Sequence, residues 1–240
     1  MNVRPHVFVI NWPGVSENAR VIESALLARC TVLNTDPVAD GLGWVQQPPD
    51  AFYAARWNKA LELLDGNVLG IICADVTCRS WDRLLARAKQ AFAAMPNLAI
   101  YAPNVSYSYW IASPTQLHSV GDGLFEVPIT DGMCWFLRSD LVSEIGPVDL
   151  SLNTLGWGID LVAPALAAIN GWQVVRDYRV SVEHPQSCGY NQAQANHEAS
   201  VYLNRFQPYV QEKVRELRER GHQLRLNSLA EPHERRSIRR

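Results

Sequence analysis

Asp160 and His184 are the residues whose types and positions best suit catalysis in this sequence. Asp160 follows the loop Gly156-Trp157-Gly158 and opens an apolar run with helical spacing, and His184 ends a β-branched run. A carboxylate can take a proton from an attacking hydroxyl, and an imidazole is a common metal ligand. Each also has a structural alternative, because Asp160 could only cap a helix and His184 could be a hydrogen-bonded structural histidine.

Two further carboxylates, Asp36 and Asp75, follow apolar runs that read as buried strands. The carboxyl ends of parallel strands border the crevice where open α/β sheets bind ligands. A carboxylate there can hold a hard cation, which in turn neutralises phosphates. Aspartate is also frequent in turns and helix caps, so that alternative stays open for both.

Alternating segments in the first hundred residues predict the elements that position these side chains. The expected strands are 6–10, 31–34, 68–73 and 98–101, and the expected helices begin at Ser16 or cover 51–64 and 80–95, with a loop at 38–50. Strands and helices joined by short links form βαβ units with right-handed crossovers, so we expect a parallel sheet.

The pattern changes after residue 101. Residues 101–123 are rich in Tyr, Ser and Pro, and long irregular segments of this kind are usually functional or disordered. We expect strands at 124–129, 133–137, 172–175 and 179–183, helices at 139–145 and 159–170, and a helical segment from 192 to about 220. A helix that starts at residue 159 favours an anion at its first turn, so we expect Asp160 to stay ionised.

Composition excludes several classes of protein. The 240 residues are 48% hydrophobic, which suits one large domain or a domain with a tail, and the net charge of −2 argues against a general nucleic-acid binder. The sequence contains no apolar run of the roughly 18 residues that a membrane span needs. The five cysteines lack paired metal-site spacing, and residues 1–5 lead directly into a strand, so we expect no signal peptide and a reduced, cytoplasmic setting.

The C-terminal part carries a different charge from the rest. From Arg205 onward there are ten Lys or Arg and five Asp or Glu, a balance of +5, whereas the remainder carries 12 and 19, a balance of −7. The arm could be a solvated helix with ion pairs along its surface. Alternatively, it could contact anionic lipid or a partner protein.

Short motifs recur along the chain in a characteristic order. They are VFVIN (7–11), VLNTD (32–36), RWNKA (56–60), CAD (73–75), DGMCWFLR (131–138), IGPVD (145–149), GWGID (156–160) and HP (184–185). Together they resemble the glycosyltransferases of the GT-A fold, in layout most similar to the inverting enzymes of family 2. The resemblance implies an α/β, Rossmann-like GT-A domain over residues 1–190, with a mixed central sheet flanked by helices. Within it, 1–101 would bind the nucleotide and 102–190 the acceptor and metal, and 191–240 would form a C-terminal helical basic arm.

The resemblance also implies roles for individual residues. Asp36 would contact the nucleobase or ribose, Asp75 and His184 would hold Mn²⁺ or Mg²⁺, and Asp160 would be the catalytic base. The remaining candidates are Asn11, Arg56 and Asn58, with Asp75, on the nucleotide-sugar, and Trp110, Asp131, Trp135 and Trp157 on the acceptor. Tryptophans are often simply core residues, and Asp131 could be a turn residue before a glycine.

Two motifs depart from the family pattern. Its Asp-x-Asp metal motif reads Cys73-Ala74-Asp75 here, and its Glu-Asp pair reads Ile159-Asp160.

The resemblance predicts an inverting transferase that uses a nucleotide-sugar donor and a glycan or lipid-linked acceptor in bacterial surface polysaccharide biosynthesis. Loss of the first metal ligand leaves open a catalytically inactive binding module. A sugar nucleotidyltransferase is a further alternative, but Asn11-Trp12-Pro13-Gly14 lacks the Gly-rich basic loop that would grip a triphosphate.

Overall fold

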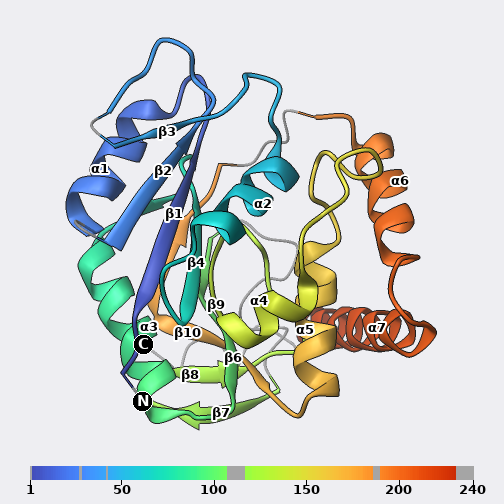
Figure 1. The fold of residues 1–240 in the computed structure, drawn as a ribbon. Helices are drawn as coiled ribbons and strands as arrows, with labels where there is room; N and C mark the ends of the chain where they lie inside the picture. The colour runs from blue at the N-terminus through green and yellow to red at the C-terminus, as the bar shows by residue number, and fades with distance from the viewer. Residues whose placement is uncertain (1, 27–28, 42, 107–116, 186–189, 231–240) are drawn as a thin grey trace.

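The computed structural model describes residues 2–26, 29–41, 43–106, 117–185 and 190–230 (Figure 1). Its strands are β1 (Pro5–Asn11), β2 (Cys30–Asn34), β3 (Val45–Gln46), β4 (Val68–Cys73), β5 (Thr77–Cys78), β6 (Leu98–Val105), β7 (His118–Gly121), β8 (Leu124–Glu126), β9 (Cys134–Arg138) and β10 (Gln173–Glu183). Its helices are α1 (Ser16–Leu26), α2 (Tyr53–Leu63), α3 (Trp81–Ala94), α4 (Ser139–Ile145), α5 (Ile159–Ile169), α6 (Gln192–Leu203) and α7 (Pro208–Ala230).

All these strands belong to one mixed sheet with the order β3-β2-β1-β4-β9-β6-β10-β8-β7, and β5 pairs with β10. The parallel pairing of β1 with β2 and β4 confirms the first part of the expected layout. The fourth expected strand, β6, runs in the same direction as this parallel set but is not next to it, because antiparallel β9 lies between β4 and β6. Residues 134–137 of β9 are all buried, which suits a central position between two strands.

Other boundaries also differ from those expected. The late strands at 172–175 and 179–183 are one strand, β10, whose register against β6 shifts between Asp177 and Ser181. The helical segment from 192 is two helices, and Pro208 begins the second. A proline is tolerated at the first position of a helix, because the backbone N–H that it lacks would have no partner within the helix there. The expected loop at 38–50 contains β3, and β6 extends to Val105.

Helices cover both faces of the sheet (Figure 1). Buried side chains of α1 and α3 pack on one face. Those of α2, α4 and α5 pack on the other face, together with Val210 and Val214 of α7. One side of α7 is therefore part of the hydrophobic core, so the interpretation of this arm as a solvated helix is wrong for that side.

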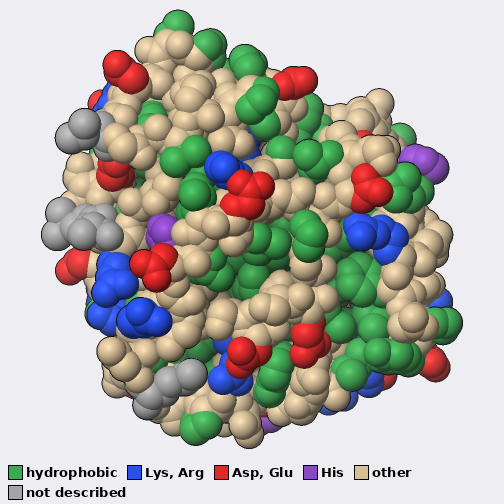
Figure 2. Space-filling view, in the orientation of Figure 1, with side chains coloured by type: hydrophobic (Ala, Val, Ile, Leu, Met, Phe, Trp, Pro, Cys, Tyr) green, Lys and Arg blue, Asp and Glu red, His purple; other side chains and the backbone are tan. Residues whose placement is uncertain are grey.

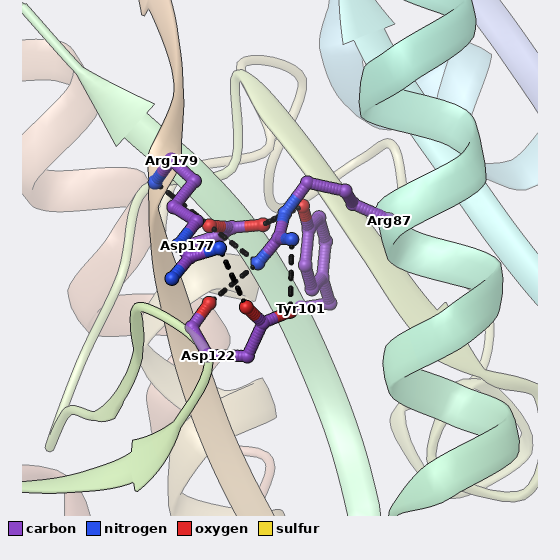
Figure 3. A network of polar contacts seen from close by, with 5 residues as sticks. All are labelled: Arg87, Tyr101, Asp122, Asp177 and Arg179. Atoms are coloured by element: carbon purple, nitrogen blue, oxygen red, sulfur yellow. Dashed lines mark hydrogen bonds and ion pairs between the residues drawn. The ribbon is translucent and has the colours of Figure 1, made fainter.

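A polar network around Asp177 fastens β10 to the rest of the domain (Figure 3). The Asp177 carboxylate, which is fully buried, accepts hydrogen bonds from Arg87 of α3 and from the hydroxyl of Tyr101 of β6, the latter at 2.7 Å. Arg87 also pairs with Asp122 of the β7–β8 turn at 3.0 Å, and Arg179 pairs with Asp122 at 2.7 Å. The network joins a helix, two strands and a turn around one buried charge.

We expect Asp177→Asn to lower the free energy of unfolding by about 3 kcal/mol, because it leaves the Arg87 guanidinium without its buried counter-ion. Chemical denaturation checks this value. Arg179→Gln is the matched control: its side chain is 55% exposed, so its loss should cost less than about 1 kcal/mol. Equal losses for both variants would contradict the assignment of the network to Asp177.

Candidate active site

A cavity of about 1550 Å³ lies at the carboxyl ends of β1 and β4. Its walls come from the ends of these strands, the start of α2, the Gly/Trp loop before α5, the end of β10, and one side each of α6 and α7. Of the expected site residues, those in its lining are Arg56, Asp75, Asp131, Trp135, Trp157, Asp160 and His184. Figure 2 shows hydrophobic side chains gathered over the middle of the face that carries α2 and α4, with charged side chains scattered around them.

The loop before α5 owes its shape to two glycines. Gly156 and Gly158 have φ angles of +75° and +97°, which other residues rarely adopt. A Cβ atom on Gly156 would also lie 2.7 Å from Cδ1 of Tyr53, at the start of α2. The loop can therefore pass close to α2 and deliver Asp160 to the first turn of α5.

Glu198 of α6 holds this loop in place. Its carboxylate accepts hydrogen bonds from the backbone N–H groups of Thr154 at 2.8 Å and Leu155 at 2.9 Å. Within the loop, the Asn153 side chain accepts from the Gly156 N–H at 2.7 Å and donates to the Trp157 carbonyl at 2.8 Å. Sequence reasoning missed Glu198, because no local pattern connects a residue on α6 to a loop more than forty residues earlier.

Burial raises the pKa of Asp160 to about 6, and the negative charge of Asp131 adds to the rise. The backbone N–H groups at the start of α5 act in the opposite direction but do not outweigh burial. The expectation that the helix terminus controls this carboxylate is therefore wrong. Asp160 is still mostly ionised at neutral pH, but neutral pH is only about one unit above the pKa at which this carboxylate is half protonated.

The raised pKa predicts that the Asp160 charge destabilises the fold. An acid whose pKa is higher in the folded state binds its proton more tightly there, so its contribution to stability falls as the pH rises from about 4 to 6. We expect Asp160→Asn to increase the free energy of unfolding by about 1–2 kcal/mol at pH 8 and to leave it nearly unchanged at pH 4. Denaturation at the two pH values measures this, and a variant less stable than wild type at pH 8 would contradict it.

Asp75 and His184 lie next to each other in the lining of the cavity. The Asp75 Oδ2 and His184 Nε2 atoms are 3.3 Å apart. The other oxygen of Asp75, Oδ1, is buried and has no hydrogen-bond partner among the described residues. A carboxylate oxygen in this state beside an imidazole suits two ligands of a divalent cation. No cluster of three or more candidate metal ligands occurs in the described part of the chain.

Cys73 cannot replace the missing carboxylate of the metal motif as an anion. Burial and the neighbouring Asp75 raise the pKa of its thiol far above neutral pH. The residue instead ends the central strand β4, where its backbone N–H donates to the Met133 carbonyl at 2.8 Å. Any metal held here would therefore have one carboxylate and one imidazole from this chain.

Arg56 provides a buried positive charge on another side of the cavity. The guanidinium donates to the Thr35 hydroxyl at 3.0 Å and to the Ala51 carbonyl at 2.6 Å, and it lies 6.0 Å from the Trp12 ring centre. Burial lowers its pKa to about 10, so it remains charged at neutral pH. Its Nε is buried without a hydrogen-bond partner, and Arg56 forms no ion pair with any described carboxylate. This combination suits an anionic ligand.

The expected acceptor residues differ in how far their side chains are exposed to the cavity. Asp131 is nearly buried and pairs with Arg176 at 3.3 Å. The Trp157 ring is half-buried and meets Tyr190 edge to face at 5.7 Å. Trp135 is fully buried and packs against Trp57, so its ring belongs to the core. Trp110 lies outside the described residues.

Two expected nucleotide-binding residues lie behind the cavity wall. Asn11 donates to the Asn34 side chain at 2.7 Å and to the Ser16 hydroxyl at 2.8 Å, and Ser16 in turn donates to Asp36 at 2.7 Å. Neither Asn11 nor Asp36 is in the lining. In this structure the network secures the turn after β2, which carries Thr35 into the wall.

Asn58 is also absent from the lining. Its amide donates to the Val148 carbonyl and accepts from the Val148 N–H, both at 2.8 Å. The side chain thus joins α2 to the segment after α4 by pairing with both backbone groups of one residue. A nucleotide contact by Asn58 stays a prediction that would require breaking this pairing.

Sequence reasoning also missed the wall formed by α6 and α7. The lining residues there are Gln192, Asn196, Ala199, Ser200, Leu203, Arg215, Arg218, Glu219 and His222. Within each helix most of them recur at intervals of three or four residues, which places them on one side. The spacing was visible in the sequence, but only the packing of α7 against α5 turns that side towards the cavity.

Comparison with solved structures shows that the fold of this chain is similar to those of glycosyltransferases. GalNAc-T7 with UDP, GalNAc and Mn²⁺ matches with a TM-score of 0.59 and 13% identity over 92% of this chain, which spans only 55% of that one. The mannosyltransferase PcManGT from Pyrobaculum calidifontis, in complex with GDP-Man and Mn²⁺, matches with a TM-score of 0.52 and 14% identity over 99% of this chain and 79% of that one.

This chain has the GT-A fold. The expected fold class, with its mixed central sheet flanked by helices, is therefore confirmed. At this level of identity the GT-A likeness extends to the fold and not to the activity. No protein-family model matches the sequence, and no curated protein matches it. Within the described residues, no helix is both long enough and apolar enough to cross a membrane.

Proposed function

We propose that this GT-A domain is an inverting glycosyltransferase that moves a sugar from a nucleotide-sugar to a hydroxyl group of a glycan or lipid-linked acceptor. The observation that carries the proposal is one cavity that contains a carboxylate with a pKa near neutrality, an Asp–His pair and a buried arginine. Asp160, Asp75 with His184, and Arg56 come from four separate segments. Their convergence favours an enzyme over a binding module that has lost its chemistry.

Asp160 would act as the base. It takes the proton from the acceptor hydroxyl as that oxygen attacks the anomeric carbon, while the bond from this carbon to the diphosphate breaks and the diphosphate leaves with the electron pair. One direct displacement inverts the configuration at that carbon. A pKa of about 6 suits this task, because the carboxylate is ionised at neutral pH yet basic enough to accept a proton.

The donor would occupy the side of the cavity formed by the strand ends. Asp75 and His184 would hold a divalent cation, Mn²⁺ or Mg²⁺, which neutralises the diphosphate when bound. Arg56 would pair with a donor phosphate or nucleobase oxygen, and Trp12 lies beside it. Asn11, Asp36 and Asn58 remain candidates for donor contacts only if their present hydrogen bonds rearrange.

The acceptor would lie against the Gly/Trp loop. Trp157 would offer an aromatic surface to a sugar ring, and Asp131, which also lines the cavity, would accept a hydrogen bond from a hydroxyl. A cytoplasmic role in bacterial surface polysaccharide synthesis remains part of the proposal. The proposal also includes a peripheral contact with a membrane or partner protein, which the exposed Arg220 of α7 would make.

We expect Asp160→Asn to lower transfer by about 10²–10⁴-fold, because an amide cannot accept the proton. The measurement is release of nucleoside diphosphate from UDP- and GDP-sugars in the presence of mixed glycan acceptors. Asp140→Asn is the control, since that side chain is 69% exposed on α4. Transfer by the Asp160 variant at the wild-type rate, with donor binding intact, would refute the role of this base.

Calorimetry with UDP and GDP tests the Asp75–His184 pair. We expect at least tenfold tighter binding with Mn²⁺ than with EDTA, and we expect Asp75→Asn to abolish that difference because one of two protein ligands is lost. His118→Gln, an exposed change on β7, should keep it. Binding without any catalysed transfer would support the inactive module, and tighter binding of nucleoside triphosphates would support the nucleotidyltransferase.

A further inference from the structure

The cavity-facing side of α7 carries charge that the proposed reaction does not use. Arg215, Arg218, Glu219 and His222 all line the cavity. Val210 and Val214, just before them, are buried in the core, so the start of the helix is fixed against the domain. The two arginines are exposed towards the cavity from a rigid element rather than from a loose tail.

Neither Arg215 nor Arg218 forms an ion pair within the described part of the chain. Like charges three residues apart on a helix repel each other by about 0.2–0.5 kcal/mol. The carboxylates of the cavity have other neighbours: Asp75 pairs with His184, and Asp131 pairs with Arg176. Among the described residues, neither guanidinium has a carboxylate within ion-pair distance, although Glu219 of the same helix also lines the cavity.

These arginines come from a different part of the cavity than the strand ends at which the donor is proposed to bind. Asp160 begins α5, and α5 packs directly along α7. In Figure 1 both helices lie well away from β1 and β2, whose ends form the donor side of the cavity. The positive charge of Arg218 also acts to lower the pKa of Asp160, which places it within electrostatic reach of the base.

The facing wall of α6 has a different character. Its lining residues Gln192, Asn196 and Ser200 carry amide and hydroxyl groups without charge. Such groups donate to and accept from sugar hydroxyls. A ligand that touches both helices would therefore meet hydrogen-bonding groups from α6 and the two guanidiniums from α7.

We propose that Arg215 and Arg218 bind an anionic group, a phosphate or a carboxylate, on the acceptor. The planar guanidinium fork matches both anions with two parallel hydrogen bonds. An acceptor held in this way would present its hydroxyl to Asp160 while its anion remains on α7. The inference rests on the proposed glycosyl transfer and narrows its acceptor to acidic sugars or phosphate-linked glycans.

Three sugars test this site by ligand-observed NMR on the full chain at low salt: methyl glucuronide, glucose 1-phosphate and neutral methyl glucoside. UDP or GDP and diamagnetic Mg²⁺ are present to occupy the donor side. We expect at least one of the anionic sugars to bind about tenfold or more tightly than the neutral one, and higher salt to reduce the difference. The tighter of the two anionic sugars identifies the anion as a carboxylate or a phosphate.

Arg215→Gln combined with Arg218→Gln should remove this preference and leave the affinity for the nucleoside diphosphate unchanged. Glutamine keeps a high helix propensity, so α7 should still form. Arg220→Gln, an exposed arginine of α7 outside the cavity lining, is the matched control and should keep the preference.

Equal binding of charged and neutral sugars, or a double variant that behaves as wild type, would overturn the proposal. Loss of nucleoside diphosphate affinity in the double variant would also overturn it, because the arginines would then serve the donor. None of these results would refute glycosyl transfer, which the Asp160 variant tests separately.

Discussion

The position of β9 in the centre of the sheet determines the geometry of the whole cavity. Because β9 runs antiparallel between β4 and β6, the residues just before it meet the residues just after β4. Asp131 and Gly132 thereby enter the same wall as Cys73 and Asp75. On the far side of β6, strand β10 runs parallel to it and carries His184 to the same edge. The Asp177 network secures β10 in that place.

Charges in the cavity fall into two groups with different consequences. Asp75 and Asp131 each have a cationic or titratable neighbour within 3.3 Å. Asp160 has no such neighbour among the described residues, and its pKa rises because of burial and the nearby Asp131 charge. The same desolvation that makes this carboxylate basic also costs stability, which is a common compromise at catalytic sites.

The C-terminal helices complete the cavity rather than extend from it. Glu198 of α6 fixes the loop that delivers Asp160, and α7 packs on α5 while it turns Arg215 and Arg218 towards the open space. The described residues of 191–230 thus contribute Glu198 and one side each of α6 and α7 to the cavity that Asp160 lines.

Local periodicity and short motifs were enough to predict the alternation of strands and helices, the helices that became α4 and α5, and the candidate residues Arg56, Asp75, Asp160 and His184. The lateral order of the strands depends instead on tertiary packing, since an apolar run such as 134–137 suits any central position. The same packing sets the hydrogen bonds that Asn11, Asp36 and Asn58 make within the fold. The pKa of Asp160 and the roles of Glu198 and α7 depend on burial and on contacts between residues far apart in the chain, and such contacts leave no local pattern in the sequence.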